Sequence, residues 1–327
     1  MTTTHPGRNT PDRMDLPFVG LVTFARQPAC PDWNRLDGAD VAVLGIPLDT
    51  ASSYRVGTRF GPRAIREASM FHGFGPDGVF DFEDETTYLT AEEVKIVDAG
   101  DADMIYADTR RSLENAEQAV RALLDAGTMP YILGGDHAIT MATVAAYAGQ
   151  APIHIVHLDA HFDFIDARNG ISWGHGSPMR RASEMAHVAG ITTLGARNMA
   201  AVSRKDWEAA RVYGTHVTSM RKLRAEGITA ALRHIPDGTR VYVSIDIDAF
   251  DPAIAPGTAT ISHGGLAYVE VRDILKELAR RTEVVGVDFV EVSPPYDPSG
   301  ITSLLAARVS LDFIGAIFHE RALRRAG

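Results

Sequence analysis

The stretch "IHIVHLDAHFD", residues 153–163, begins as an apolar, β-branched run and ends in alternating polar residues. Asp159, His161 and Asp163 occupy every second position of its second half. Residues at this spacing share one face of an extended strand, or fan around its carboxyl end if the chain turns there. The stretch therefore joins a buried strand to two carboxylates and an imidazole.

Further β-branched runs alternate along the chain with segments of helical period. The runs lie at residues 40–47, 95–101, 129–136, 191–197, 240–251 and 283–292, and the helical segments at 109–127, 203–214, 265–281 and 300–318. Several runs are apolar on both faces, which is typical of a parallel sheet covered by helices on both sides. We therefore predict a polar tail over residues 1–15, followed by a single α/β domain over residues 16–327 with no linker inside it.

Two segments do not fit this alternation. Residues 52–69, "SSYRVGTRFGPRAIREAS", form an arginine-rich, glycine-containing loop that leads into a helix. Residues 72–89 form a long acidic loop. Loops of this length in compact domains are usually functional or disordered, so the sequence leaves open a solvated excursion and a functional segment.

Composition limits the classes of partner. The net charge of −10 argues against a nucleic-acid partner and permits a cationic substrate. Cys30 is the single cysteine, which excludes an intramolecular disulfide framework and a thiolate zinc cluster. The N-terminus has no apolar signal-peptide core, and no segment has ~18 uninterrupted apolar residues. We expect a cytoplasmic protein that binds neither nucleic acid nor membrane.

Polar residues also follow two other predicted strands. Asp246 and Asp248 end the run "VSIDIDAFDP" (243–252), and His137 follows Gly-Gly-Asp in "YILGGDHAIT" (131–140). The carboxyl ends of parallel strands lie at one edge of a sheet, where ligands bind in open α/β folds. Taken singly, such a histidine is more often structural, and such an aspartate is more often a helix cap or turn former. Asp136 keeps that capping interpretation.

Taken together, these residues predict a metal site. Four carboxylates buried close together would become protonated or cost several kcal/mol each unless cations lay beside them. The motifs contain no lysine or arginine. Four carboxylates and two neutral imidazoles carry about −4 in charge, which two divalent ions neutralise, as in two-metal hydrolytic sites. Oxygen and imidazole ligands suit manganese, and also nickel, cobalt or zinc.

The motifs also resemble those of a known family. "GGDHAIT", "HLDAHFDF", "SIDIDAFDP" and "GVDFVEVSPPYD" are similar, in this order and spacing, to motifs of the ureohydrolase superfamily of arginases, agmatinases and guanidinobutyrases. The arginine loop "YRVGTRFGPRAIR" is most similar to the agmatinase-like branch. The resemblance covers residues 40–317. It implies a three-layer α/β/α fold with a mainly parallel eight-stranded sheet, and a homo-oligomer, usually a trimer or hexamer.

The resemblance further implies a binuclear centre of divalent ions, with manganese first and nickel as the alternative. By motif, one ion would be held by His137, Asp159, Asp163 and Asp246. The other would be held by His161, Asp159, Asp246 and Asp248, so that Asp159 and Asp246 bridge the two ions.

The implied reaction is hydrolysis of a guanidino group to urea and an amine. His175 in "WGHGSPMRRA" matches the family's proton-shuttling histidine, and Glu291 in "FVEVSPP" matches the carboxylate that orients the guanidinium. Asp163 would stabilise the tetrahedral intermediate together with the metals. The plainer alternatives are a loop histidine without a role and a glutamate paired with an arginine.

The substrate is the least determined part of this prediction. Agmatinases usually carry a segment close to "PGTGTPxPGG", whereas residues 256–265 read "PGTATISHGG". Residues 164–174, which also face the pocket in relatives, match neither the arginase nor the agmatinase pattern closely. Agmatine is the first single candidate, and guanidinobutyrate, guanidinopropionate, guanidine and biguanides remain alternatives. Three weaker alternatives remain. A non-catalytic subunit of a hetero-oligomer predicts lost ligands, and all are present. A one-zinc deacetylase does not predict the second pair, Asp246 and Asp248, and a metal-binding scaffold leaves His175 and Glu291 unexplained.

Overall fold

One eight-stranded sheet organises the protein. The computed structural model describes residues 16–36, 38–199 and 201–326, so the expected polar tail at 1–15 lies outside the described residues. The sheet order is β4-β1-β5-β10-β9-β6-β7-β8, and every pairing in it is parallel. The strands are β1 (Val41–Ile46), β4 (Ile96–Asp101), β5 (Met129–Gly134), β6 (Ile153–Leu158), β7 (Val188–Leu194), β8 (His216–Thr218), β9 (Arg240–Asp246) and β10 (Glu283–Val290).

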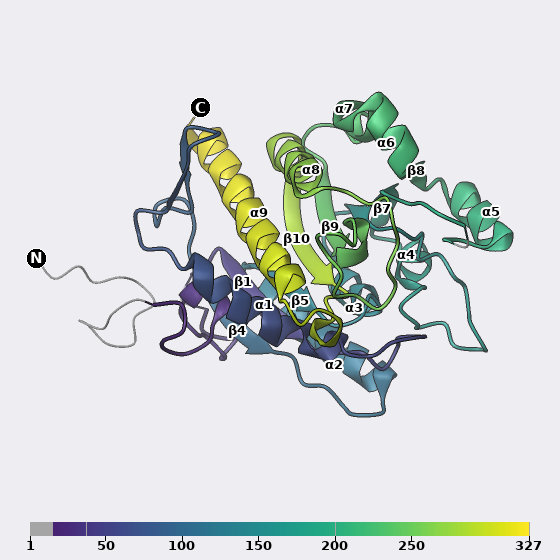
Figure 1. Cartoon of the computed structure of the whole chain (residues 1–327), viewed down its shortest axis with the longest axis horizontal. Coiled ribbons are helices and arrows are strands. Elements are labelled where there is room, and N and C mark those ends of the chain that lie inside the picture. The colour runs from purple at the N-terminus through teal and green to yellow at the C-terminus, as the bar shows by residue number, and fades with distance from the viewer. Residues whose placement is uncertain (1–15, 37, 200, 327) are drawn as a thin grey trace, which may run out of the picture.

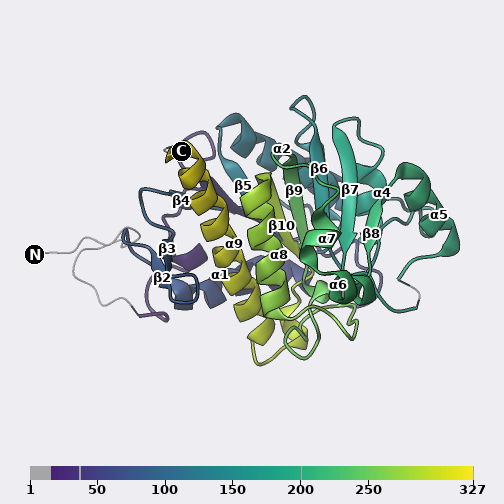
Figure 2. The same ribbon diagram turned by 90° about the horizontal axis from the view of Figure 1, so that it is seen from above.

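Helices cover both faces of this sheet. In β1, Val41 and Val43 belong to the core formed with α8 (Tyr268–Arg281) and α9 (Ile301–Ala326), whereas Ala42 and Leu44 pack in the core formed with α2 (Thr109–Asp125). Successive strand residues therefore point into two different helical layers, which confirms the expected three-layer architecture (Figures 1 and 2). One layer contains α1 (Gly61–Ser69), α6 (Met220–Glu226), α7 (Ile228–Leu232), α8 (Tyr268–Arg281) and α9 (Ile301–Ala326); the other contains α2 (Thr109–Asp125), α3 (Ile139–Ala145), α4 (Pro178–Ala182) and α5 (Arg204–Tyr213).

Side-chain caps determine where several helices begin. Asp108, Ser203 and Ser219 each accept a hydrogen bond from a backbone N–H in the first turn of α2, α5 and α6. Such caps satisfy donors that have no partner inside the helix. Gly214 ends α5 with a φ of +94°, a conformation that glycine adopts without steric cost.

The acidic loop at 72–89 is a structured hairpin of β2 (Val79–Asp81) and β3 (Thr86–Tyr88). Asp84 lies 2.8 Å from Arg272 Nη2 and 2.5 Å from Lys276 Nζ, both on α8. The acidic residues therefore bind a basic face of α8 and do not form a solvated excursion. Ion pairs with a distant helix leave no periodic signal in the sequence, so the loop composition alone did not reveal them.

Helix α9 is apolar enough to need explanation. Among the described residues it is the one helix whose length and composition would allow it to cross a membrane, but 72% of its most apolar window is buried inside the protein. It packs along α8 and α1 (Figure 1). Its apolar residues are thus accounted for by the core.

Candidate metal centre

Four adjacent strands deliver the predicted site residues to one edge of the sheet. The strands β5, β10, β9 and β6 are consecutive neighbours in the sheet. His137 follows β5, Glu291 follows β10, and Asp246 ends β9. Parallel strands place these carboxyl ends together, so residues up to 154 positions apart in the chain come into contact.

The loop after β6 supplies more of the predicted site residues than any other segment. The strand ends at Leu158, so Asp159, His161 and Asp163 fan around its carboxyl end and do not share a strand face. Asp163 has a φ of +46°, an uncommon conformation for a residue other than glycine. Its carbonyl accepts hydrogen bonds from the backbone N–H groups of Met179 and Arg180 at the start of α4.

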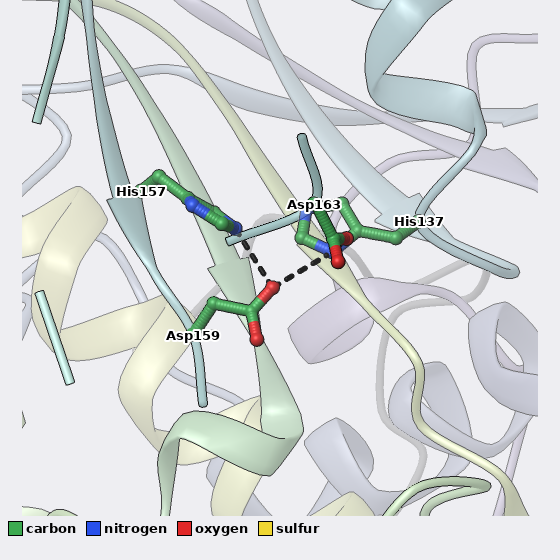
Figure 3. Close-up of side chains that lie close together, drawn as sticks. All are labelled: His137, His157, Asp159 and Asp163. Carbon is green, nitrogen blue, oxygen red and sulfur yellow. Dashed lines mark hydrogen bonds and ion pairs between the residues drawn. The ribbon is translucent and has the colours of Figure 1, made fainter. Parts of the chain in front are cut away.

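A first cluster forms around His137. Its Nδ1 lies 3.3 Å from Asp159 Oδ2, 3.0 Å from Asp163 Oδ2 and 3.0 Å from Asp246 Oδ2. Figure 3 shows His137, from the turn after β5, converging with Asp159 and Asp163, from the loop after β6. These are the four residues that the sequence assigned to one metal ion.

A second cluster shares Asp159 with the first. His161 Nδ1 lies 3.3 Å from Asp159 Oδ1 and 3.1 Å from Asp248 Oδ2. Asp159 thus presents one oxygen to each cluster. Asp246 Oδ2 faces His137, while its Oδ1 accepts a hydrogen bond of 2.8 Å from the backbone N–H of Asp248.

The electrostatics of the two clusters favour bound cations. Burial, followed by repulsion from Asp248, raises the pKa of Asp246 well above its usual value. Burial and repulsion from Asp159 likewise raise the pKa of Asp248. Within the described part of the chain, no lysine or arginine forms an ion pair with Asp159, Asp163, Asp246 or Asp248. Buried carboxylates and imidazoles without cationic side chains are a donor set that fits divalent metal ions.

His157 is a residue of this centre that sequence reasoning missed. It is fully buried, and its Nε2 lies 2.8 Å from Asp159 Oδ2 while its Nδ1 lies 3.2 Å from Thr193 Oγ1 (Figure 3). The sequence analysis treated it as part of the apolar half of the strand. Its position two residues before Asp159 was the available signal, because an imidazole inside a buried strand needs a polar partner.

Ser244 and Asp288 orient the first histidine. Asp288 Oδ1 accepts a hydrogen bond of 2.6 Å from the Ser244 hydroxyl, whose oxygen lies 3.0 Å from His137 Nε2. Because the only hydroxyl proton of Ser244 goes to Asp288, Ser244 accepts the Nε2–H of His137. In the neutral imidazole of His137, this hydrogen bond leaves the Nδ1 lone pair facing the carboxylates, which is the tautomer that a metal ligand needs.

Glu291 and His175 lie beside the first cluster. Glu291 Oε1 accepts a hydrogen bond of 2.9 Å from the backbone N–H of His137 and lies 3.2 Å from His175 Nδ1. Its Oε2 is buried and has no hydrogen-bond partner in the described part of the chain. Burial lowers the pKa of His175, but the contact with Glu291 outweighs this effect and raises that pKa to about 9. The His175 Nε2 lies 2.8 Å from Ser53 Oγ.

Asp136 holds the surrounding backbone, as the capping interpretation expected. Its carboxylate accepts hydrogen bonds from the backbone N–H groups of Ala138, at 3.1 Å, and Ala51, at 2.9 Å. Burial and the negative charge of Glu291 raise the pKa of Asp136 to about 7. Asp136 therefore connects the turn that carries His137 to the loop that carries Ser53.

Comparison with known proteins assigns the family. The family model described as "Arginase family" matches residues 39–315 of this chain. The chain belongs to the arginase family. Proclavaminate amidinohydrolase from Streptomyces clavuligerus is 37% identical over 91% of this chain and 93% of that protein. Agmatinase from Bacillus anthracis is 34% identical over 90% of this chain and 96% of that protein.

Structural comparison agrees with this assignment. The solved structure of proclavaminate amidino hydrolase from Streptomyces clavuligerus superposes with a TM-score of 0.81 and 34% identity, covering 93% of this chain and 99% of that chain. The predicted family, the arginase-like fold and the enzyme class, a hydrolase of guanidino carbon–nitrogen bonds, are thereby confirmed.

In this arginase-family enzyme, the two clusters open into a cavity of about 490 Å³, a size suited to a small molecule. Thr260, in the segment that departs from the agmatinase pattern, lines the cavity and donates a hydrogen bond of 2.9 Å to Asp248 Oδ2. The other polar or charged side chains in the lining are Ser53, His161, Asp163, Arg168, His175, Ser203, Asp206, Asp246 and Glu291.

Proposed function

We propose that this enzyme hydrolyses a guanidino compound to urea and an amine, using two divalent metal ions. One observation carries the proposal: Asp159 presents one oxygen to each of two His-Asp clusters, beside the unpartnered buried oxygen of Glu291. Two such clusters supply ligands for a pair of ions, and the free carboxylate oxygen supplies an acceptor for a cationic guanidinium.

The metal ligands are proposed as follows. His137, Asp159, Asp163 and Asp246 hold one ion, and His161, Asp159, Asp246 and Asp248 hold the other, with manganese preferred and nickel as the alternative. When bound, the ions supply Lewis acidity and a water acidic enough to act as a nucleophile near neutral pH.

The residues of the chain position the substrate and move the proton. Glu291 Oε2 accepts N–H groups of the substrate guanidinium and holds its carbon toward the two clusters, a positioning effect. Asp163 supports the tetrahedral arrangement that follows the addition of water. The contact with Glu291 raises the pKa of His175 to about 9, which favours the protonated imidazole that can give a proton to the leaving amine. The substrate and one water thus become urea and an amine.

Agmatine is the single substrate put forward by the sequence, and guanidino acids, guanidine and biguanides share the reacting group. Agmatine adds a cationic tail to the guanidinium, a guanidino acid adds an anionic tail, and guanidine has no tail. The cavity-lining residues that contact the tail of the substrate therefore select among these compounds. We further propose a cytoplasmic homo-oligomer, a trimer or hexamer, without a nucleic-acid or membrane partner.

The test is urea release by purified protein loaded in turn with manganese, nickel and cobalt. The substrate panel covers agmatine, arginine, guanidino acids, guanidine and biguanides. We expect metal-dependent urea from at least one of them, with no urea from protein treated with chelator. Absence of urea with every metal and every substrate refutes the proposed function.

A further inference from the structure

Arg168 lines the cavity from a hydrogen-bonded turn in the loop after β6. Its backbone N–H donates to Ile171 O at 2.8 Å, and the N–H of Ile171 donates back to Arg168 O at 2.9 Å. Between them, Asn169 and Gly170 have φ values of +53° and +81°. Two central residues with positive φ, in the order Asn-Gly, make a tight type I′ turn. The base of the Arg168 side chain is therefore held in place.

The guanidinium of Arg168 is available to a ligand. Its Nη1 donates a hydrogen bond of 3.2 Å to Ser53 Oγ, and within residues 16–36, 38–199 and 201–326 it forms no ion pair with a carboxylate. By contrast, Arg180 and Arg181 on the neighbouring α4 are paired with Glu184. A guanidinium has five N–H donors, so most donors of Arg168 remain free.

Arg168 also carries the only guanidinium among the described residues that line the cavity. No other arginine or lysine is among the described residues that line it. Ser53 Oγ, which accepts from Arg168, lies 2.8 Å from His175 Nε2, and His175 Nδ1 lies 3.2 Å from Glu291 Oε1. One hydroxyl and one imidazole thus separate Arg168 from the carboxylate proposed to bind the reacting guanidinium. A short aliphatic tail would direct its far end toward Arg168.

From this arrangement we infer that the substrate is a guanidino acid with a short aliphatic spacer, whose carboxylate binds Arg168. The inference rests on the proposed function and deepens it. A carboxylate matches the free guanidinium in charge and in paired hydrogen bonds. The ammonium tail of agmatine would meet a like charge there, and guanidine would leave Arg168 without a partner.

Asp206 is the opposing candidate, because a carboxylate in the same cavity lining could bind an ammonium tail. Its Oδ2 accepts a hydrogen bond of 2.6 Å from the Ser203 hydroxyl, and its backbone N–H donates to that hydroxyl at 3.1 Å. Asp206 is therefore engaged in the cap that begins α5, and its carboxylate lies next to the positive end of the helix dipole. The guanidinium of Arg168, by contrast, takes part in no helix cap and no ion pair among the described residues.

The experiment compares three substrates that share one guanidinium and differ in tail charge. They are 4-guanidinobutyrate, n-butylguanidine and agmatine, measured as kcat/KM on the metal-loaded full chain. The wild type should prefer 4-guanidinobutyrate to n-butylguanidine, and Arg168→Gln should lower that ratio about 10- to 100-fold, as expected for the loss of a charge-assisted hydrogen bond. The ratio for Arg168→Lys should lie between the ratios for the wild type and Arg168→Gln. Arg168→Glu should shift the preference to agmatine.

Arg211→Gln is the matched control. Arg211 is an exposed arginine of α5 that contacts the Trp207 ring and does not line the cavity. In this control variant, the ratio of kcat/KM for 4-guanidinobutyrate to kcat/KM for n-butylguanidine should equal that of the wild type. The metal content and Tm of each variant are measured alongside.

The possible outcomes distinguish failure of the guanidino-acid inference from failure of the proposed function. A wild type that releases urea from n-butylguanidine or agmatine at least as efficiently as from 4-guanidinobutyrate refutes the guanidino-acid inference and leaves the proposed reaction standing. An Arg168→Gln ratio within twofold of the wild-type ratio refutes the role of Arg168. If the protein releases urea neither from these three substrates nor from any other guanidino compound, the proposed function is refuted and this inference with it.

Discussion

Ser244→Ala tests whether the network behind His137 prepares the metal site. Ser244, His137 and Asp288 are all buried, and the serine hydroxyl links His137 Nε2 at 3.0 Å to Asp288 Oδ1 at 2.6 Å. Alanine removes both hydrogen bonds, one of them to a charged group, which should lower the free energy of unfolding by about 2 to 4 kcal/mol. The freed imidazole can also change tautomer, so metal affinity should fall about 10- to 100-fold.

Ser310→Ala separates these two effects. Ser310 is a buried serine of α9 whose hydroxyl donates to Ala306 O at 2.7 Å, and it contacts no member of the metal centre. Urea unfolding of chelator-treated protein gives the stability loss, and competition with a metal-binding dye gives the affinity. We expect both variants to lose stability and only Ser244→Ala to lose metal affinity. Wild-type metal affinity in Ser244→Ala would refute the proposed orienting role.

Three further predictions concern the centre and a separate histidine cluster. Asp246→Ala should lose bound metal and urea release, and full metal content with full activity would contradict the two-ion assignment. Glu291→Gln should lower kcat/KM about 10- to 150-fold with unchanged metal content, because an amide replaces the charged acceptor; a loss confined to metal binding would contradict this. Burial and neighbouring histidines lower the pKa values of His154 and His234 to about 4, so at these two positions the unfolded chain binds more protons than the native protein between pH 4 and 6.5. The contribution of these two histidines to the free energy of unfolding should therefore fall as pH drops through this window, and His234→Gln should remove its share of that slope from urea-derived stability measured against pH. His263→Gln, on an exposed loop, should keep the wild-type slope.

The strands that build the centre could be predicted because they are apolar on both faces. Residues 129–136, 153–161, 240–251 and 283–292 were each expected as strands, and each contains one, ending close to the polar residue of interest. The short strand β8 was not expected, because three residues carry too little periodic signal. Hairpin β2/β3 was missed because ion pairs to α8, rather than an alternating pattern, hold it in place.

The candidate ligands could be named from the sequence, but not the contacts that orient them. His137, Asp159, His161, Asp163, Asp246 and Asp248 stand next to apolar runs, and their motifs are specific. Ser244 and Asp288 stand inside strands that look uniformly buried, and their pairing requires β9 and β10 to be neighbours in register. Sequence spacing does not contain that register.

The sequence by itself determined the family, the layered α/β fold and the identity of the candidate ligands, because periodicity and short motifs are local properties of the chain. Tertiary structure decided how those ligands come into contact, since strand order brings the ends of β5, β10, β9 and β6 together. It also decided the charge of the cavity mouth. Arg168 is one of many arginines in the sequence, and only the folded loop after β6 places it beside Ser53 and the cavity, with no carboxylate partner among the residues that the structure describes.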